Sequence, residues 1–246
     1  MNKFVILTIL YSINGAFGAL PPTIPRCRRD HPNMSQCIVN AIEALQPRFA
    51  TGDLGGGWIV PKLEPFTIKE LNYGDDGGLK VHLRGLNIYG TSKFKVDKLR
   101  ANAQELKFDA LVALPTFEIH SKYRMEFNFL GARLKSNGDY FAEHTGAKLI
   151  MPLRGRRIMQ NGIEKIRFDP IKIKFDRGTV TKLRISNLFG GNKALEEIVH
   201  SLLINNPDFV YKNVYPQLES ELSKLFTDIA NKIVETTTYD EMFPLQ

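Results

Sequence analysis

The segment FEIHSKYRMEFNF, residues 117–129, alternates apolar and polar side chains along its whole length. Side chains on a β-strand point alternately to the two faces of a sheet, so this pattern predicts one long strand with a dry face and a wet face. At about 3.3 Å per residue, such a strand spans roughly 43 Å. A dry face of this length needs a cover, and the sequence leaves open whether the protein's own core or a bound apolar molecule provides it.

Similar alternation recurs between residues 66 and 188 and predicts further strands. Turn-forming sequences rich in Gly, Asn and Asp separate these segments. Strands joined by short turns indicate an antiparallel sheet with one solvated face, and the regular strand–helix alternation of a Rossmann-type fold is missing from the sequence. The clearest additional strands are predicted at residues 79–83, 106–114 and 171–175.

The sequence SQCIVNAIEALQP predicts a helix near the N-terminus, because apolar residues recur on one helical face. We expect Ser35 to cap this helix and Pro47 to end it. The Gly-rich residues 51–58 that follow are expected to form a flexible connection. They lack the preceding strand and the following Lys-Ser/Thr helix of a phosphate-binding loop.

The last quarter of the chain has the helical period of 3.6 residues. Residues 192–203 predict one helix and residues 207–235 a longer one, with Asn206 as its N-cap and Pro216 expected to kink or split it. The longer helix would extend about 43 Å, which matches the predicted strand. Because its apolar stripe needs a cover, the sequence predicts an α+β fold in which a strongly curved antiparallel sheet wraps around the long C-terminal helix.

Residues 1–18 have the pattern of a secretory signal peptide. Lys3 precedes an apolar run from residue 4 to residue 13, and residues 16–18 are suited to a cleavage site. The apolar run is too short for a membrane-spanning helix. We therefore expect a secreted protein whose residues 19–246 form a single domain.

The two cysteines of the chain, Cys27 and Cys37, agree with secretion and are expected to form one disulfide. Closing this short loop should stabilise the fold by about 3 kcal/mol in the chain-entropy model. A zinc site would need more Cys or His ligands, and only His31 is near, so we expect no metal. Asn33 begins an Asn-Met-Ser sequon, and the sequence leaves its glycosylation open.

The formal net charge of +7 could favour acidic partners such as membrane surfaces or glycosaminoglycans. A solvated basic surface is the more ordinary interpretation, and nucleic acid is not expected because Lys and Arg are spread along a secreted chain. The sequence has no Gly-x-Ser-x-Gly or His-Glu-x-x-His motif and its five histidines are scattered, so an enzyme is not expected. A catalytic triad assembled only in space is the remaining enzymatic alternative, as in an esterase.

Several segments, in order, carry a family resemblance. They are the Cys27–Cys37 region, WIVPKLEPFTIKEL, GLKVHLRGLNIYGTSKFKVDKLR, LRISNLFGGNKALEEIVHSLLINN and YDEMFP. Together they resemble the insect takeout/juvenile hormone-binding protein family over nearly the whole chain after the leader. Having only one cysteine pair makes the chain similar to the takeout-like branch. It departs from the family pattern at residues 129–144 and 205–209, which bears on the ligand more than on the fold.

The resemblance implies a tubular lipid-binding fold that is elongated and encloses an apolar tunnel. It implies a secreted, extracellular haemolymph protein that carries a small lipophilic ligand, either a terpenoid hormone or a fatty-acyl molecule. It also implies a monomer without catalytic residues or cofactors, and leaves transient contact with a membrane or receptor open. A secreted protein that binds anionic surfaces, with its tunnel packed shut, is the alternative.

The candidate ligand-binding residues come from the two apolar stripes, and each could instead be ordinary core. Tyrosine hydroxyls among them could orient the polar end of a ligand. The predicted set is Phe117, Tyr123, Met125, Phe127 and Phe129 from the strand, with Val210, Tyr211, Val214, Tyr215, Leu218 and Leu222 from the helix.

Overall fold

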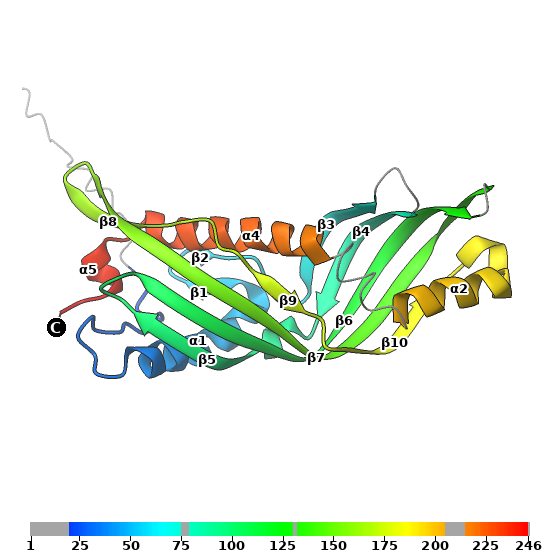
Figure 1. The fold of residues 1–246 in the computed structure, drawn as a ribbon. Helices are drawn as coiled ribbons and strands as arrows, with labels where there is room; N and C mark the ends of the chain where they lie inside the picture. The colour runs from blue at the N-terminus through cyan, green and yellow to red at the C-terminus, as the bar shows by residue number, and fades with distance from the viewer. Residues whose placement is uncertain (1–19, 75–78, 130–131, 205–214, 246) are drawn as a thin grey trace, which may run out of the picture.

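A strongly curled antiparallel sheet and a long C-terminal helix form most of the molecule, which is elongated (Figure 1). This computed structural model describes residues 20–74, 79–129, 132–204 and 215–245. Of these, residues 79, 127, 129, 132, 199, 200 and 202–204 are described by their backbone only. The predicted α+β class, with the sheet wrapped around the helix, is confirmed. The predicted signal peptide, residues 1–18, lies outside the described residues.

Within the described residues, the main sheet has eight strands, and every strand pair in it is antiparallel. Five strands follow the order β10-β7-β6-β4-β3, while β5 pairs with β6, and β8 and β9 pair with β7. The strands are β3 (Phe66–Gly74), β4 (Leu79–Tyr89), β5 (Lys95–Asn102), β6 (Lys107–Phe129), β7 (Ala132–Gln160), β8 (Ile163–Phe168), β9 (Lys174–Asp176) and β10 (Thr179–Ile185).

The two strands predicted on either side of Pro115 form the single 23-residue strand β6. Its register with β7 continues from Leu114–Ala147 to Thr116–Thr145, so Pro115 lies across from Gly146. Proline has no N–H to donate, and Gly146 has a φ of +70° that favours glycine, so the ladder changes direction here without losing register.

This change of direction reverses which residues of β6 face inward. Before Pro115 the buried residues are even-numbered, such as Phe108 and Leu114, whereas after it they are odd-numbered, such as Phe117 and Tyr123. Both halves of the strand therefore turn their apolar side chains toward the interior of the molecule.

The N-terminal helix α1 (Met34–Thr51) differs from the prediction at both ends. Its N-cap is Asn33, whose side chain accepts from the N–H of Gln36, while the Oγ of Ser35 accepts from Ala101 in β5. The helix continues through Pro47 and ends at Gly52, whose left-handed backbone closes it. Beyond the proline, the ring of Phe49 packs against Phe94 and the carbonyls of Phe49 and Ala50 accept from residues 63 and 64; these tertiary contacts outweigh its helix-breaking tendency.

The connection after α1 was predicted to be flexible. It instead contains a small hairpin of β1 (Asp53–Gly55) and β2 (Trp58–Ile59). The predicted disulfide between Cys27 and Cys37 is present and joins the N-terminal arm to α1. Asn33 is exposed, and its glycosylation stays a prediction.

Helix α2 (Lys193–Ile204) is close to its predicted bounds, and the short η1 (Thr91–Lys93), η2 (Leu188–Gly191) and α5 (Tyr239–Met242) complete the fold. The long helix α4 is described from Tyr215 to Glu235. Pro216 therefore lies in its first turn, where a missing N–H is tolerated. Asn206 and residues 207–214, predicted as the start of this helix, lie outside the described residues. No helix in the described part is long and apolar enough to cross a membrane.

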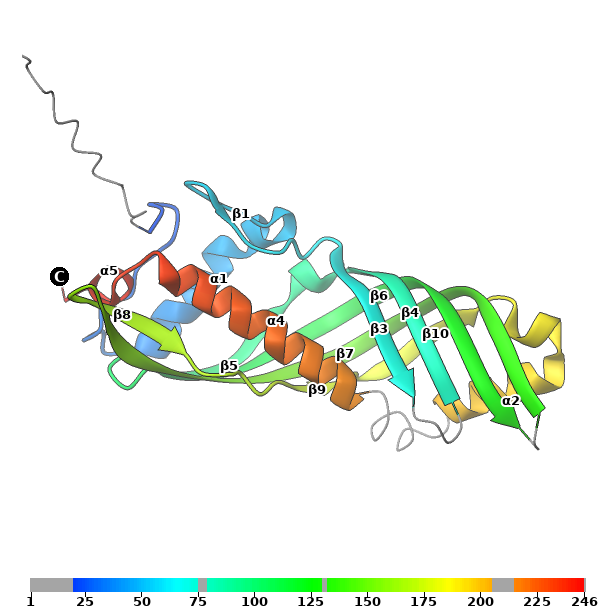
Figure 2. The same cartoon turned by 90° about the horizontal axis from the view of Figure 1, so that it is seen from above.

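Helices α4 and α2 occupy different halves of the elongated molecule (Figures 1 and 2). Helix α4 lies along the half that also contains α1, β8 and the C-terminus, and α2 lies along the half formed by the far ends of β4, β6, β7 and β10. The long helix therefore covers only part of the sheet.

Helix α4 is attached to the sheet by four polar side chains spaced four residues apart. They accept hydrogen bonds of 2.9–3.0 Å from backbone N–H groups of the segment 168–175. The segment 171–173, predicted as strand, is therefore not strand; it uses helix side chains in place of a neighbouring strand. The bonds run from Phe175, Ile173, Ile171 and Phe168 to Glu219, Ser223, Thr227 and Asn231, respectively.

We expect Thr227→Val to lower the free energy of unfolding by about 1–3 kcal/mol, because the N–H of the buried Ile171 loses its acceptor while side-chain shape is nearly kept. Urea unfolding would measure this change. The exposed Lys224→Ala on the same helix is the control and should change stability by less than about 0.5 kcal/mol. Equal stability of the Thr227 and Lys224 variants would contradict a structural role for this bond.

Candidate ligand-binding site

An apolar cavity of about 730 Å³ lies inside the molecule, bordered by the sheet and by helices α1 and α4. This volume falls within the range of roughly 300–1,000 Å³ that is typical of small-molecule sites. Its wall is almost entirely aliphatic and aromatic, and it includes Ile42, Phe49, Leu83, Val112, Met151 and Leu222.

The long apolar stripe of β6 packs in two different environments along the cavity. Phe117 belongs to a core cluster with Leu222 of α4. Farther along the strand, Tyr123 and Met125 pack with Leu188 of η2 instead of the long helix. The stripe therefore contributes both to the protein core and to the wall of an empty volume.

Six of the predicted binding residues border the cavity. The side chains of Phe127 and Phe129, and all of Val210, Tyr211 and Val214, lie outside the described residues. Contact of any of these residues with a ligand stays a prediction. The six bordering residues are Phe117, Tyr123, Met125, Tyr215, Leu218 and Leu222.

The hydroxyl of Tyr123 already has partners within the protein. It lies 2.8 Å from the Oγ of Ser136 and donates to the carbonyl of Ser186 over 2.8 Å. Ser136 in turn donates to the carbonyl of Asn187 and accepts from the N–H of Phe189. Tyr123 thus fixes the turn before α2 and presents mainly its ring to the cavity.

A row of aromatic rings crosses the centre of the molecule from α4 to β7. The ring centroids of Tyr215 and Phe175 are 5.6 Å apart, and those of Phe175 and Phe117 are 6.4 Å apart. Phe117 then stacks on the imidazole of His144 with a centroid distance of 4.8 Å and an interplanar angle of 4°. All four side chains border the cavity.

His144 is a polar residue in this apolar wall, and only 7% of it is exposed. Neither ring nitrogen has a hydrogen-bond partner of full geometry among the described residues; only the backbone of Arg177 makes a weaker polar contact with the ring. Burial lowers the pKa of His144 to about 4, and a polar contact with the backbone of Arg177 opposes this shift only in part. The imidazole is therefore neutral near pH 7.

Tyr140 and Arg177 border the cavity beside His144. Burial raises the pKa of Tyr140 to about 12, and the positive charge of Arg177 opposes this change. The sequence analysis missed these three residues. The alternation of residues 140–144, YFAEH, was the available signal. Tyr140 and His144 fall on one face of the strand and the aromatic Phe141 falls on the other, so the pattern did not show which face turns inward.

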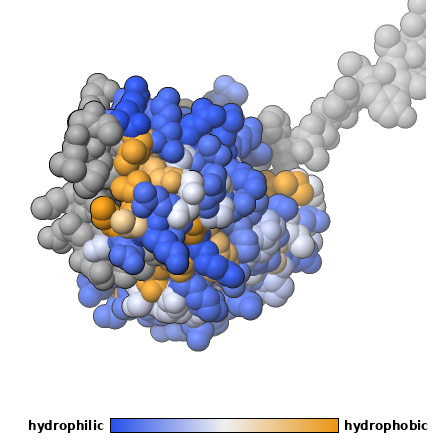
Figure 3. All heavy atoms as spheres, turned by 90° about the vertical axis from the view of Figure 1, so that its right-hand side faces the viewer, coloured by the Kyte–Doolittle hydropathy of each residue, from blue (hydrophilic) through white to orange (hydrophobic). Residues whose placement is uncertain are grey.

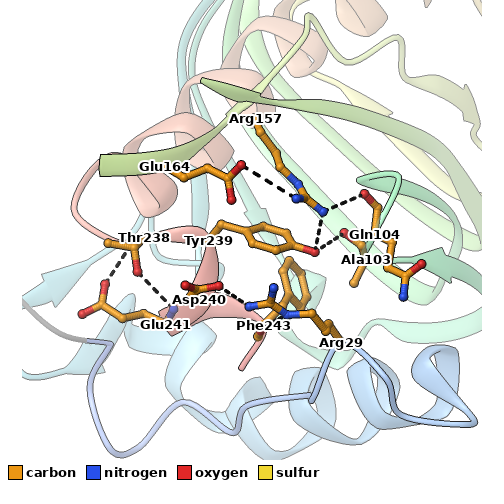
Figure 4. A network of polar contacts seen from close by, with 10 residues as sticks. All are labelled: Arg29, Ala103, Gln104, Arg157, Glu164, Thr238, Tyr239, Asp240, Glu241 and Phe243. Atoms are coloured by element: carbon orange, nitrogen blue, oxygen red, sulfur yellow. Dashed lines mark hydrogen bonds and ion pairs between the residues drawn. The ribbon is translucent and has the colours of Figure 1, made fainter. Parts of the chain in front are cut away.

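A network around Tyr239 of α5 lies next to the cavity-wall residues Val234, Met242 and Phe243 (Figure 4). The ring of Tyr239 is completely buried between the guanidinium groups of Arg29 and Arg157, which lie 4.5 and 4.0 Å from its centroid. Its hydroxyl donates to the carbonyl of Ala103, and Arg29 donates to the carbonyl of Phe243. These contacts join the N-terminal arm to the C-terminal tail.

The opposite end of the molecule, which carries α2, is different. Its surface is largely hydrophilic, but hydrophobic atoms gather in one area of it (Figure 3). Apolar side chains thus reach the surface at this end of the molecule.

The curled sheet and its long helix, with the apolar cavity that they border, define a tubular lipid-binding fold. The chain belongs to the haemolymph juvenile hormone binding protein family, whose model matches residues 4–244. The crystal structure of Epiphyas postvittana Takeout 1 is similar with a TM-score of 0.71 and 16% sequence identity, over 90% of this chain and 100% of that one, and this similarity establishes the fold.

A crystal structure of lipopolysaccharide binding protein gives a TM-score of 0.38 and 13% identity, over 78% of this chain and 36% of that one. Among curated protein sequences there is no significant match to this chain. The family and the fold therefore rest on the family model and on the Takeout 1 structure.

The buried His144 should make the protein less stable as the pH falls from about 6.5 to 4. In this window the unfolded chain binds a proton at His144 that the folded chain does not, so the stability contributed above pH 6.5 is lost as the pH falls. The expected loss from this group is roughly 3 kcal/mol. Urea unfolding at several pH values would measure it.

His144→Phe should lose this part of the pH dependence, because phenylalanine does not titrate and can still stack on Phe117. The exposed His120→Gln is the matched control and should keep the pH profile of the unchanged protein. Parallel profiles for the two variants would contradict the depressed pKa of His144.

Proposed function

We propose that this protein is a secreted carrier that binds one small lipophilic molecule, of terpenoid or fatty-acyl type, in its apolar cavity. The observation that carries this proposal is the cavity itself, whose wall consists almost entirely of apolar side chains. Membership of a family named for the binding of juvenile hormone in haemolymph supports it.

The energetics of such a cavity are sufficient for carriage. Burying about 400 Å² of apolar ligand surface contributes roughly 10 kcal/mol at 25 cal/mol per Å². Association and ordering cost at least about 4 kcal/mol, so micromolar affinity or somewhat better is expected. The hydroxyl of Tyr140 and the imidazole of His144 are polar groups of the wall that would orient the polar end of a ligand.

The proposal includes secretion and the absence of catalysis. Removal of residues 1–18 would leave a single monomeric domain, residues 19–246, and the Cys27–Cys37 disulfide is consistent with an oxidising compartment. A carrier would not turn over ester substrates, whereas the esterase alternative would. Steady hydrolysis of a fatty-acyl ester by the purified protein would overturn this part of the proposal.

Organic extraction and mass spectrometry of the protein purified from a secreting insect cell line would test carriage directly. One lipophilic species near one equivalent per protein is the expected result. A folded protein from which no lipid is extracted, and which takes up none from a mixed lipid extract, would overturn the proposal.

Filling the cavity should prevent binding. Leu218 borders the cavity from α4, and Leu218→Trp is expected to weaken binding of the fluorescent probe N-phenyl-1-naphthylamine by about tenfold or more. Lys224→Trp adds the same side chain at an exposed position of the same helix and should leave probe affinity within about twofold. Equal affinities of both variants would show that the probe binds elsewhere.

A further inference from the structure

The β7–β8 hairpin carries a combination of exposed side chains that the cavity does not explain. Asn161 and Gly162 form its two-residue turn, and both have positive φ. Beside the turn, Met159 is 69% exposed and Ile163 is 47% exposed. Burial on folding is the usual role of such side chains, so two of them flanking one turn indicate a contact outside the chain.

The same hairpin is strongly cationic. Between residues 154 and 168 there are five Lys or Arg side chains and one acidic side chain, which gives a formal charge of +4. Arg157 pairs with Glu164 at 3.7 Å, Arg154 pairs with Asp109 at 2.6 Å and Arg156 pairs with Asp169. With Asp109 and Asp169 counted, a formal charge of +2 is left. The five cations are Arg154, Arg156, Arg157, Lys165 and Arg167.

The register of the hairpin places like charges together. Arg156 lies directly opposite Arg167, and like charges in this position destabilise a strand pair. On the same face the pair next along the hairpin is Ile158 with Lys165, followed by Gln160 with Ile163. This outward face therefore has cations followed by Ile158 and Ile163 toward the tip, whereas Met159 lies on the other face of the hairpin, opposite Glu164. Met159 and Ile163 flank the tip from its two faces.

The hairpin projects from the end of the molecule that carries α5 and the C-terminus (Figures 1 and 2). Its Arg157 is also part of the network that buries Tyr239, as Figure 4 shows. Val234, Met242 and Phe243 border the cavity at this end. The hairpin and these cavity-wall residues therefore lie at the same end of the molecule.

We propose that the β7–β8 hairpin docks this protein onto anionic phospholipid bilayers, with Met159 and Ile163 entering the interface and Arg156 and Arg167 contacting lipid phosphates. Cations near an anionic membrane each strengthen binding, and apolar side chains at a tip gain by leaving water. A soluble polyanion such as heparin would use the cations but not the apolar tip, so the bilayer explains both features. This inference is independent of which lipid the cavity holds.

Co-sedimentation of the full secreted protein with vesicles would test the inference. Vesicles of phosphatidylcholine with 30% phosphatidylserine should bind the protein, and vesicles of phosphatidylcholine alone should bind it much less. Replacing both cations, in R156Q/R167Q, should weaken binding to the anionic vesicles by about 25-fold, from roughly fivefold for each cation. The double variant M159S/I163S should weaken binding to the same vesicles by about tenfold or more.

Two controls separate docking from general charge and hydrophobicity. Arg124→Gln removes an exposed cation from β6, and Ile59→Ser removes an exposed apolar side chain from β2; both should bind vesicles like the unchanged protein. All variants should keep the free energy of unfolding in urea within about 0.5 kcal/mol of the unchanged protein, because the substituted side chains are exposed.

Hairpin variants that bind anionic vesicles as well as the unchanged protein would overturn the inference. Binding to a heparin column that depends on Arg156 and Arg167, with no binding to vesicles, would also overturn it and identify a polyanion site. Neither result would affect the proposed carrier function, which is read from the extracted lipid.

Discussion

The hydrogen bonds between α4 and the segment 168–175 hold the remainder of the structure in position. Buried backbone N–H groups need acceptors, and in this segment no neighbouring strand provides them for Ile171 and Ile173. Polar side chains of α4 take the place of that strand, which fixes the helix against the curled sheet. Because the bonds repeat every four residues, they set the rotation of α4, and its apolar residues, such as Leu218 and Leu222, then face the cavity.

The polar groups of the interior divide into those that the fold uses and those that it leaves to the cavity wall. Tyr123 and Ser136 hold the turn before α2, and Tyr239 packs between two guanidinium groups. Burial keeps His144 neutral without giving its nitrogens a hydrogen-bond partner of full geometry among the described residues. An apolar volume with a few such groups is suited to a molecule that is mostly hydrocarbon with one polar end.

Local pattern was sufficient for the strands at residues 79–83, 106–114 and 117–129 and for the type of most helices. It failed where a tertiary contact outweighed a local preference, as at residues 171–173, which are not strand. The alternation at residues 117–129 identified the inward face of β6, but Pro115 was expected to separate two strands because its tolerance depends on Gly146 of the neighbouring strand. Pro47 failed as a helix end for the related reason that packing stabilised the turn beyond it. The apolar stripes of the strand and the long helix likewise did not show which residues belong to the core and which to the cavity wall, since both require apolar side chains.

The sequence by itself determined the antiparallel sheet, the long helix, the disulfide and the family, because each depends on period, spacing or residue order along the chain. Only the tertiary structure decided which face of residues 140–144 turns inward, which helix side chains replace a strand, and that Arg156 lies opposite Arg167. These features depend on strand register and helix rotation. Both are set by contacts between residues far apart in the chain, and a single-residue shift in register would send each side chain to the opposite face.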